Sequence, residues 1–211
     1  MIGASAGIGR ATALRLGELG FPVAVVGRRQ ARLDEVVATA GGHAFVADVS
    51  HPTQCAGLVE EAVEALGGLD LVAHAASTSR LALLVDAGAE YWTEVLQTNV
   101  VGPALIAAAA VPHLSPAGVG CLLSSESVGQ PYPGIVPYVV SKAALEELAR
   151  GLRIEHPELR ICCLQVGATS DTEFGRDFDA ALGAELFPRW IGLGKLPAQF
   201  MTATELGGAI A

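Results

Sequence analysis

Three side chains near the middle of the chain have types and spacing suited to moving a proton. Ser125 follows the apolar run 121–123, and Tyr138 and Lys142 lie four residues apart just after Pro137. Positions four apart on a helix project from the same face, so the phenol and the ammonium would be neighbours. A free phenol has a pKa near 10 and is a poor acid or base at neutral pH. At roughly 5 Å, with an effective dielectric of about 20, one cation would lower that pKa by about two units before burial opposes it.

The same pair also has a simpler interpretation. A tyrosine and a lysine at helical spacing are commonly a half-exposed aromatic ring with a solvated charge beside it. The catalytic interpretation therefore depends on the elements around the pair, which must bring a strand end and a helix start together.

Strand and helix patterns alternate along the whole sequence. Apolar runs rich in Val, Ile and Leu, typical of strands covered on both faces, occur at 22–27, 43–49, 69–76, 119–124 and 159–166. Helical patterns lie between them, at 8–19, 31–40, 52–66, 88–111 and 138–155. This order predicts right-handed crossovers and an α/β fold with a doubly wound parallel sheet of the Rossmann type, in a single domain spanning 1–211.

Both ends of the chain differ from the pattern expected for such a sheet. A glycine-rich turn normally follows a buried strand, and here only Met1 and Ile2 precede it; the chain then stops at Ala211, inside a helix expected from about Thr202. Because the strand before that turn is central, we expect the first strand, and also a final one, to be missing from this chain. An intact mass of the natural protein equal to 21.6 kDa would contradict this expectation.

Composition excludes several classes of function. The net charge of −9 argues against a nucleic-acid or anionic-membrane partner, and no secretory leader is present. The longest apolar run, 100–111, is too short to span a bilayer and is expected to be a core helix. The four cysteines lack metal-ligand spacing, so we expect no metal site and a reducing, cytoplasmic location; they are Cys55, Cys121, Cys162 and Cys163.

The first residues contain a motif that could hold a nucleotide. Gly3, Gly7 and Gly9 form a G-x-x-x-G-x-G turn at the start of a helix that begins near Ile8. Glycines there allow the backbone to approach a pyrophosphate, whose charge is stabilised by the helix N-terminus. Small-residue turns also serve simple packing, and the position at the head of alternating strands and helices favours the nucleotide.

Two arginines follow the next predicted strand. Arg28 and Arg29 stand just before a helix, where a NAD site normally has a carboxylate for the ribose 2′-hydroxyl. Cations at a helix N-terminus are disfavoured by the helix dipole, so their presence there needs an explanation. A solvated basic turn gives none and is the weaker interpretation. The pair predicts NADP(H) in preference to NAD(H).

With the glycine turn, the arginines and the Tyr138/Lys142 pair in this order, the chain resembles the classical short-chain dehydrogenase/reductase family over essentially its whole length. The resemblance implies that Asn99 helps to keep a water chain to Lys142, and that Ser125, thirteen residues before Tyr138, binds the substrate carbonyl. Tyr138 to Lys142 matches the Y-x-x-S-K motif of the family. It also implies a set of cofactor-binding residues: Gly3, Ser5, Gly7, Ile8, Gly9, Arg28, Arg29, Asp48 (for the adenine amino group), Val49, Ala75, Tyr138, Lys142 and Thr169.

Some positions depart from the family pattern. His74, Ala75, Ala76 and Ser77 replace the common N-N-A-G, and we expect His74 to be structural, hydrogen-bonding between neighbouring strands. Ser124 and Ser127 flank Ser125 and leave that alignment open. Ser170 and Thr172 are alternatives to Thr169 for the nicotinamide carboxamide.

The chemistry implied is hydride transfer between nicotinamide and a carbonyl or alcohol substrate. Residues 168–201 are expected to form a substrate lid, because they hold four of the six phenylalanines, and an apolar substrate would suit it. The same aromatics could instead pack the segment onto the domain, and Arg189 with Lys195 would suit an acyl-carrier thioester. The helices at 88–111 and 138–155 are implied to form a homodimer or homotetramer. The alternative class is a non-catalytic dinucleotide sensor or scaffold of the same fold.

Overall fold

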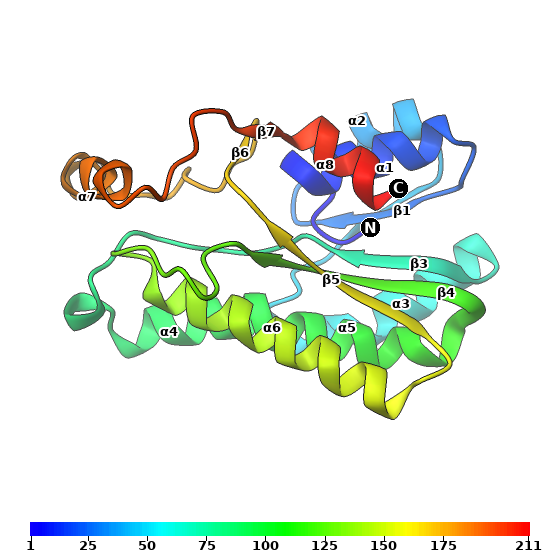
Figure 1. The fold of residues 1–211 in the computed structure, drawn as a ribbon. Coiled ribbons are helices and arrows are strands. Elements are labelled where there is room, and N and C mark those ends of the chain that lie inside the picture. The colour runs from blue at the N-terminus through cyan, green and yellow to red at the C-terminus, as the bar shows by residue number, and fades with distance from the viewer.

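The computed structural model describes all 211 residues and shows the predicted alternation of strands and helices (Figure 1). The main strands are β1 (Ala24–Gly27), β2 (His43–Val46), β3 (Leu69–His74), β4 (Leu114–Ser125) and β5 (Arg160–Val166). The main helices are α1 (Gly7–Glu18), α2 (Gln30–Ala40), α3 (Pro52–Leu66), α6 (Val136–Glu155) and α8 (Ala203–Ile210). The predicted elements are confirmed, with most boundaries within a few residues.

All the strand pairs are parallel. β1 pairs with β2, while β3, β4 and β5 pair in that order, and Ile2 forms single bridges to both Val26 and His74. Figure 1 shows α1, α2 and α8 on one face of the sheet and α3, α6 and a further helix, α5 (Gly102–Ala110), on the other. The doubly wound α/β architecture is confirmed, and the ends of β1, β3 and β4 meet at one edge, as parallel crossovers require.

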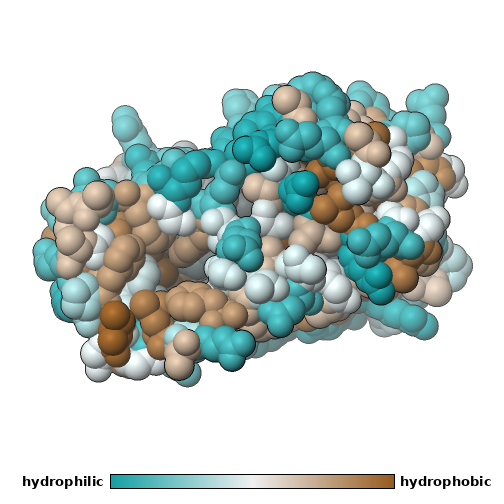
Figure 2. Space-filling model, turned by 90° about the horizontal axis from the view of Figure 1, so that it is seen from above, coloured by the Kyte–Doolittle hydropathy of each residue, from teal (hydrophilic) through white to brown (hydrophobic).

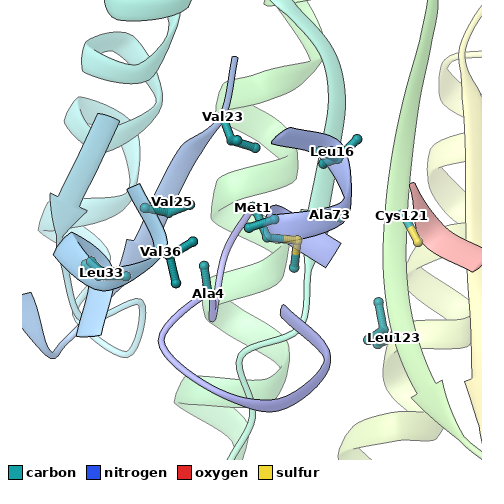
Figure 3. Close-up of a cluster of buried hydrophobic side chains, with 11 residues drawn as sticks. Met1, Ala4, Leu16, Val23, Val25, Leu33, Val36, Ala73, Cys121 and Leu123 are labelled. Atoms are coloured by element: carbon teal, nitrogen blue, oxygen red, sulfur yellow. The ribbon is translucent and has the colours of Figure 1, made fainter. Parts of the chain in front are cut away.

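The first two residues hold the two parts of the sheet together. The Met1 amine donates a hydrogen bond to the Ala24 carbonyl oxygen at 2.7 Å, and burial lowers its pKa to about 5. The Met1 side chain packs in the largest apolar cluster, beside Val25 and Ala73 (Figure 3). An apolar cavity of about 310 Å³ lies next to it, with walls from β1, β3, α1 and α3. Two residues therefore connect β1 and β3 in the core.

One long helical run crosses the second face. α4 (Ala89–Leu96) continues through a π-helical turn, η2 (Gln97–Val101), into α5 (Gly102–Ala110) and a last turn, η3 (Val111–His113). By length and composition alone, Ala89–His113 could cross a membrane. In this structure it packs on α3 and α6, with Ile106 in the core, so the predicted core helix is confirmed and is longer than the run 100–111.

Residues 168–201 form an arm that carries a helix absent from the predicted pattern. The short strands β6 (Thr169–Ser170) and β7 (Met201–Thr202) pair at its base, and α7 (Ala180–Gly192) lies at the end furthest from α8 (Figure 1). Asp179 caps α7 by accepting a hydrogen bond from the Leu182 N–H. Pro188 and the glycines near its end obscured this helix in the sequence, because such residues normally interrupt one.

Candidate active site

Ser125 and Tyr138 meet where β4 ends and α6 begins. Pro137 lies in the first turn of α6, where backbone N–H groups have no partner within the helix, so its lack of an N–H costs no hydrogen bond. The helix therefore begins there, and Tyr138 follows at a fixed place beside the strand end. Both side chains are buried, and the Ser125 side chain lies close enough to the phenol to act on its pKa. The Ser125 Oγ atom accepts hydrogen bonds from the Ser127 N–H and hydroxyl, at 3.2 and 2.9 Å. Successive strand residues face opposite sides, so Ser124 instead donates to a Glu146 carboxylate oxygen at 2.7 Å. Of the neighbouring serines, Ser125 is the one that contacts Tyr138.

Lys142 lies beneath this pair, one turn along α6. Its Nζ donates to the Leu123 carbonyl oxygen at 2.8 Å and lies 5.4 Å from the centre of the Tyr138 ring. Burial lowers the pKa of Lys142 to about 8. Burial also raises the pKa of Tyr138 to about 12, against which the Ser125 side chain acts. The lowering of the phenol pKa predicted for the ammonium does not appear in this structure, where desolvation determines the direction of the shift and the Lys142 Nζ atom is hydrogen-bonded to a carbonyl.

Asn99 occupies the π-helical turn η2 and is completely buried. Its side-chain oxygen accepts from the Thr78 N–H at 2.8 Å, and its amide nitrogen donates to the Thr78 carbonyl and to the Ser141 hydroxyl, each at 3.0 Å. A π-helical turn shifts the register of a helix by one residue and is frequent at functional sites. Asn99 therefore ties the loop after β3 to α6, next to Lys142; the water chain remains a prediction.

His74 does not have the expected role. It is buried at the end of β3, but its Nε2 atom has no hydrogen-bond partner, and no other strand receives a bond from the ring. Burial, helped by the charge of Lys142, lowers the pKa of His74 to about 3. The inter-strand hydrogen bond predicted for His74 is therefore wrong, and the ring is held neutral in the core.

The glycine turn has the geometry that a pyrophosphate needs. A Cβ atom at Gly9 would lie 2.3 Å from the Gly3 carbonyl oxygen, and one at Gly3 would lie 2.5 Å from the Ala76 nitrogen. Gly7 has φ of +50°. No side chain caps α1 at Ala6, and its first turn has no acidic residue, so this helix N-terminus can receive an anion. The residues present fit a dinucleotide.

The predicted 2′-phosphate site lies beside this turn. The Arg29 Nη2 atom donates to the Ser5 Oγ atom at 3.0 Å, while Arg28 lies 3.6 Å from an Asp48 oxygen. Partial burial of Asp48 would raise its pKa, but hydrogen bonds from Ser50 and the charge of Arg28 bring that pKa below its ordinary value. Asp48 is therefore ionised and held by Ser50 and Arg28 at the end of β2.

The remaining predicted cofactor residues surround the same edge of the sheet. Ile8 begins α1, Val49 lies buried against Gly102, and the Ala75 N–H donates to the Ile2 carbonyl oxygen at 2.9 Å. The Thr169 hydroxyl donates to the Gly167 carbonyl at 2.8 Å at the base of the arm. Thr172 lies closest to the glycine turn, against Gly7. Thr169, Ser170 and Thr172 all remain candidates for the carboxamide.

Aromatic side chains of the arm cover Tyr138. The Phe174 ring centre is 4.9 Å from that of Tyr138 and 5.2 Å from that of Phe178. Trp190 is buried, and its indole N–H donates to the Pro133 carbonyl at 2.9 Å. Seen from above (Figure 2), apolar surface gathers at the end that carries α7, and the molecule is hollowed between that end and the part carrying α1 and α8. The aromatics thus both pack the arm onto the domain and line the approach to Tyr138.

Comparison with known proteins identifies this arrangement. The family model for short chain dehydrogenases matches residues 1–182. The chain belongs to the short-chain dehydrogenase family. Among curated short-chain dehydrogenases, dehydrogenase/reductase SDR family member 4 of Pongo abelii is 38% identical over 180 residues, which are 81% of this chain and 64% of that protein. The chain thus spans less than two thirds of the length of this relative.

Solved structures of the short-chain dehydrogenase family have the same fold over the full length of this chain. A short chain dehydrogenase from Burkholderia cenocepacia in complex with NADP is 28% identical, with a TM-score of 0.85 over 87% of its length. A 3-ketoacyl-ACP reductase from Sinorhizobium meliloti is 26% identical, with a TM-score of 0.82 over 88% of its length. The family predicted from the motifs is confirmed.

Proposed function

We propose that the chain is an NADP(H)-dependent oxidoreductase that moves a hydride between a nicotinamide and a carbonyl or alcohol carbon. The observation that carries the proposal is the position of buried Ser125 beside buried Tyr138, with Lys142 buried below them, at the edge of the sheet that also holds the glycine turn. Membership of the short-chain dehydrogenase family supports the same reaction.

Each side chain has a defined task in this reaction. A bound dinucleotide supplies or accepts the hydride. Ser125 donates a hydrogen bond to the substrate oxygen, and Tyr138 gives that oxygen a proton during reduction or removes one during oxidation. With a pKa of about 12, Tyr138 is a protonated phenol at neutral pH, which suits reduction. Lys142 would hold the nicotinamide ribose and supply positive charge when the phenol gives up its proton.

The cofactor preference rests on Arg28 and Arg29 at the end of β1, where Arg29 donates a hydrogen bond to the Ser5 hydroxyl and Arg28 pairs with Asp48. Two guanidinium groups offer charge-assisted hydrogen bonds to a 2′-phosphate, and a similar short chain dehydrogenase was solved with NADP. Replacement of Arg29 by glutamine should weaken NADPH binding by about tenfold to hundredfold and leave NADH binding unchanged.

An apolar carbonyl compound or alcohol is the substrate that the arm fits best. Phe174 stands over Tyr138 and Phe178 packs on Phe174, and their rings would pack against an apolar group. The two cations proposed for a charged substrate tail already have partners: Arg189 lies 3.9 Å from Glu185 within the arm, and the Lys195 Nζ donates to Gln130, in the loop after β4, at 3.4 Å. This favours the apolar substrate over an acyl-carrier thioester.

We further propose a cytoplasmic homodimer or homotetramer. α6 exposes Val140 and Ile154 on the side away from the sheet, and the neighbouring run Ala89–His113 adds apolar surface, which a second copy would cover. All four cysteines are free thiols, which supports a reducing compartment.

Replacement of Tyr138 by phenylalanine tests the reaction. The change removes the hydroxyl proposed to exchange a proton with the substrate oxygen, so turnover of an apolar ketone with NADPH, followed by absorbance, should fall by about 10²- to 10⁴-fold. NADPH affinity, measured by fluorescence titration, should stay within about threefold. Near-full turnover by the variant would refute the mechanism, and binding without turnover by the unaltered protein on a broad carbonyl panel would favour a sensor.

A further inference from the structure

Three consecutive residues of the arm contact three different parts of the proposed cofactor site. Thr172 lies against Gly7 in the glycine turn, Glu173 pairs with Arg29, and the Phe174 ring packs on Tyr138. We call residues 171–178 the strap. The strap therefore runs from the pyrophosphate turn, past the predicted 2′-phosphate site, to the proton donor.

The contact between Glu173 and Arg29 joins residues that are 144 apart in sequence. The two side chains approach at 2.9 to 3.0 Å, and Arg29 also holds the Ser5 hydroxyl. Arg176 adds a second bond to the Glu173 carboxylate at 3.0 Å. The hydrogen bond from Arg29, with the surrounding arginine charges, lowers the pKa of Glu173, so the carboxylate is ionised at neutral pH. A carboxylate thus occupies the guanidinium donors that a 2′-phosphate would use.

The backbone turns into this position at Asp171. Its φ of 58° lies in the left-handed region, and it is the only residue other than glycine in that region. Aspartate tolerates this conformation better than most residues do. The turn directs the next three residues across the site, while the segment that follows is fastened by exposed ion pairs, including Arg176 with Asp177. Exposed pairs of this kind exchange partners readily.

We propose that Glu173 is an internal stand-in for the 2′-phosphate, and that a ligand bearing this phosphate displaces it from Arg29 and so releases the strap from Tyr138. The inference rests on the proposed function, because it takes Arg29 as the receptor for the phosphate. A dinucleotide without the phosphate leaves the pair intact and the strap in place. Glu173 would therefore link the choice of cofactor to access at the reacting groups.

The expected size of the effect follows from the exposure of the pair. Both side chains are more than a third exposed, at 38% and 37%, so the contact is screened and easily exchanged. Pairs of this kind shift an equilibrium by about twofold to fivefold. Binding free energies are reciprocal. The factor by which Glu173 weakens phosphate binding therefore equals the factor by which bound phosphate weakens closure of the strap.

The binding test uses the adenosine half of the cofactor. Calorimetric titration with 2′,5′-ADP and with 5′-AMP compares the unaltered protein, Glu173→Gln, and the matched control Asp177→Asn, which removes a strap charge that pairs with Arg176 and not with Arg29. Glu173→Gln should bind 2′,5′-ADP about twofold to fivefold more tightly and 5′-AMP equally well. The control should match the unaltered protein, and combination with Arg29→Gln should abolish the gain. Unchanged or weaker 2′,5′-ADP binding by Glu173→Gln would overturn the proposal.

A second measurement needs no nucleotide and separates this proposal from the proposed function. The N–H groups of Arg176 and Phe178 donate to carbonyls within the strap, at 3.1 and 3.2 Å. Hydrogen exchange at these amides should be about twofold to fivefold faster in Glu173→Gln than in Asp177→Asn. Equal exchange would refute the claim that the Glu173–Arg29 pair holds the strap, even if NADPH binds and reacts. Faster exchange in a protein that binds neither 2′,5′-ADP nor 5′-AMP would confirm that the pair holds the strap. The same result would refute both the proposed cofactor and the displacement step.

Discussion

The buried reacting groups and the strap that covers them are held in opposite ways. Ser125, Tyr138, Lys142 and Asn99 come from β4, η2 and α6 and are at most 9% exposed, and hydrogen bonds to backbone groups fix Lys142 and Asn99. The strap lies on the surface and is held up to Asp177 by exposed ion pairs and by the partly exposed ring of Phe174, and only Phe178 at its end packs on a buried cluster. Buried polar contacts resist change, whereas exposed pairs are easily replaced. The reacting side chains are thus held in place by the fold, whereas the strap that covers them can be displaced.

The largest effect expected from this contrast is on the acid stability of the buried side. His74 has a folded-state pKa of about 3, against an ordinary value of 6.5, because burial opposes its charge. The contribution of the neutral ring to the free energy of unfolding is fully present above about pH 6.5. It is lost as pH falls towards about 3, because the imidazole of the unfolded chain takes up a proton at a higher pH than the buried ring does. The loss across this window would reach about 5 kcal/mol, and about half of it by pH 4.5.

Urea unfolding at pH 7 and pH 4.5 measures this contribution. The unaltered protein should lose about 2 to 3 kcal/mol more than His74→Asn between the two pH values. His113→Asn is the matched control, because His113 is exposed on the surface, and it should follow the unaltered protein. Equal pH dependence in His74→Asn and the unaltered protein would show that the ring is not held neutral in the core.

A smaller but still large effect is expected when the Asn99 clamp is removed. Asn99→Ala deletes three hydrogen bonds and leaves the part-buried N–H and carbonyl groups of Thr78 without partners, while the Ser141 hydroxyl keeps its bond to the Tyr138 carbonyl. Orphaned buried groups cost about 1 to 3 kcal/mol each, so the free energy of unfolding should fall by about 3 kcal/mol. Thr93→Ala, which removes an exposed hydroxyl bonded to its own helix, should change stability by less than about 0.5 kcal/mol. A loss below about 1 kcal/mol for Asn99→Ala would show that the clamp is as loosely held as the strap.

The same contrast explains which features could be predicted from the sequence. The parallel sheet, α1 and α6, the glycine turn and the place of Tyr138 beside Lys142 follow from local patterns, because helix spacing and the succession of strands and helices determine which side chains meet. The direction of the Tyr138 pKa shift could not be predicted, since it depends on how completely the fold removes water from the ring. Glu173 was missed because its partner, Arg29, lies 144 residues away and no spacing relates them. The helix α7 was missed because Pro188 breaks the local pattern while tertiary packing of Leu186 and Trp190 retains the helix.

The smallest predicted effect separates the part of the strap that covers Tyr138 from its last residue, Phe178, which packs on the arm. Phe174 is 38% exposed and belongs to no buried cluster, whereas Phe178 packs against the cluster that contains Leu186 and Trp190. Phe174→Ala should therefore lower the free energy of unfolding by less than about 1 kcal/mol, and Phe178→Ala by about 2 kcal/mol, because only the second change leaves a cavity among packed side chains. Urea unfolding of the two variants makes the comparison. Equal losses would mean that the ring on Tyr138 is packed as firmly as the arm, and a strap that firmly packed could not be released by the exchange of one exposed ion pair.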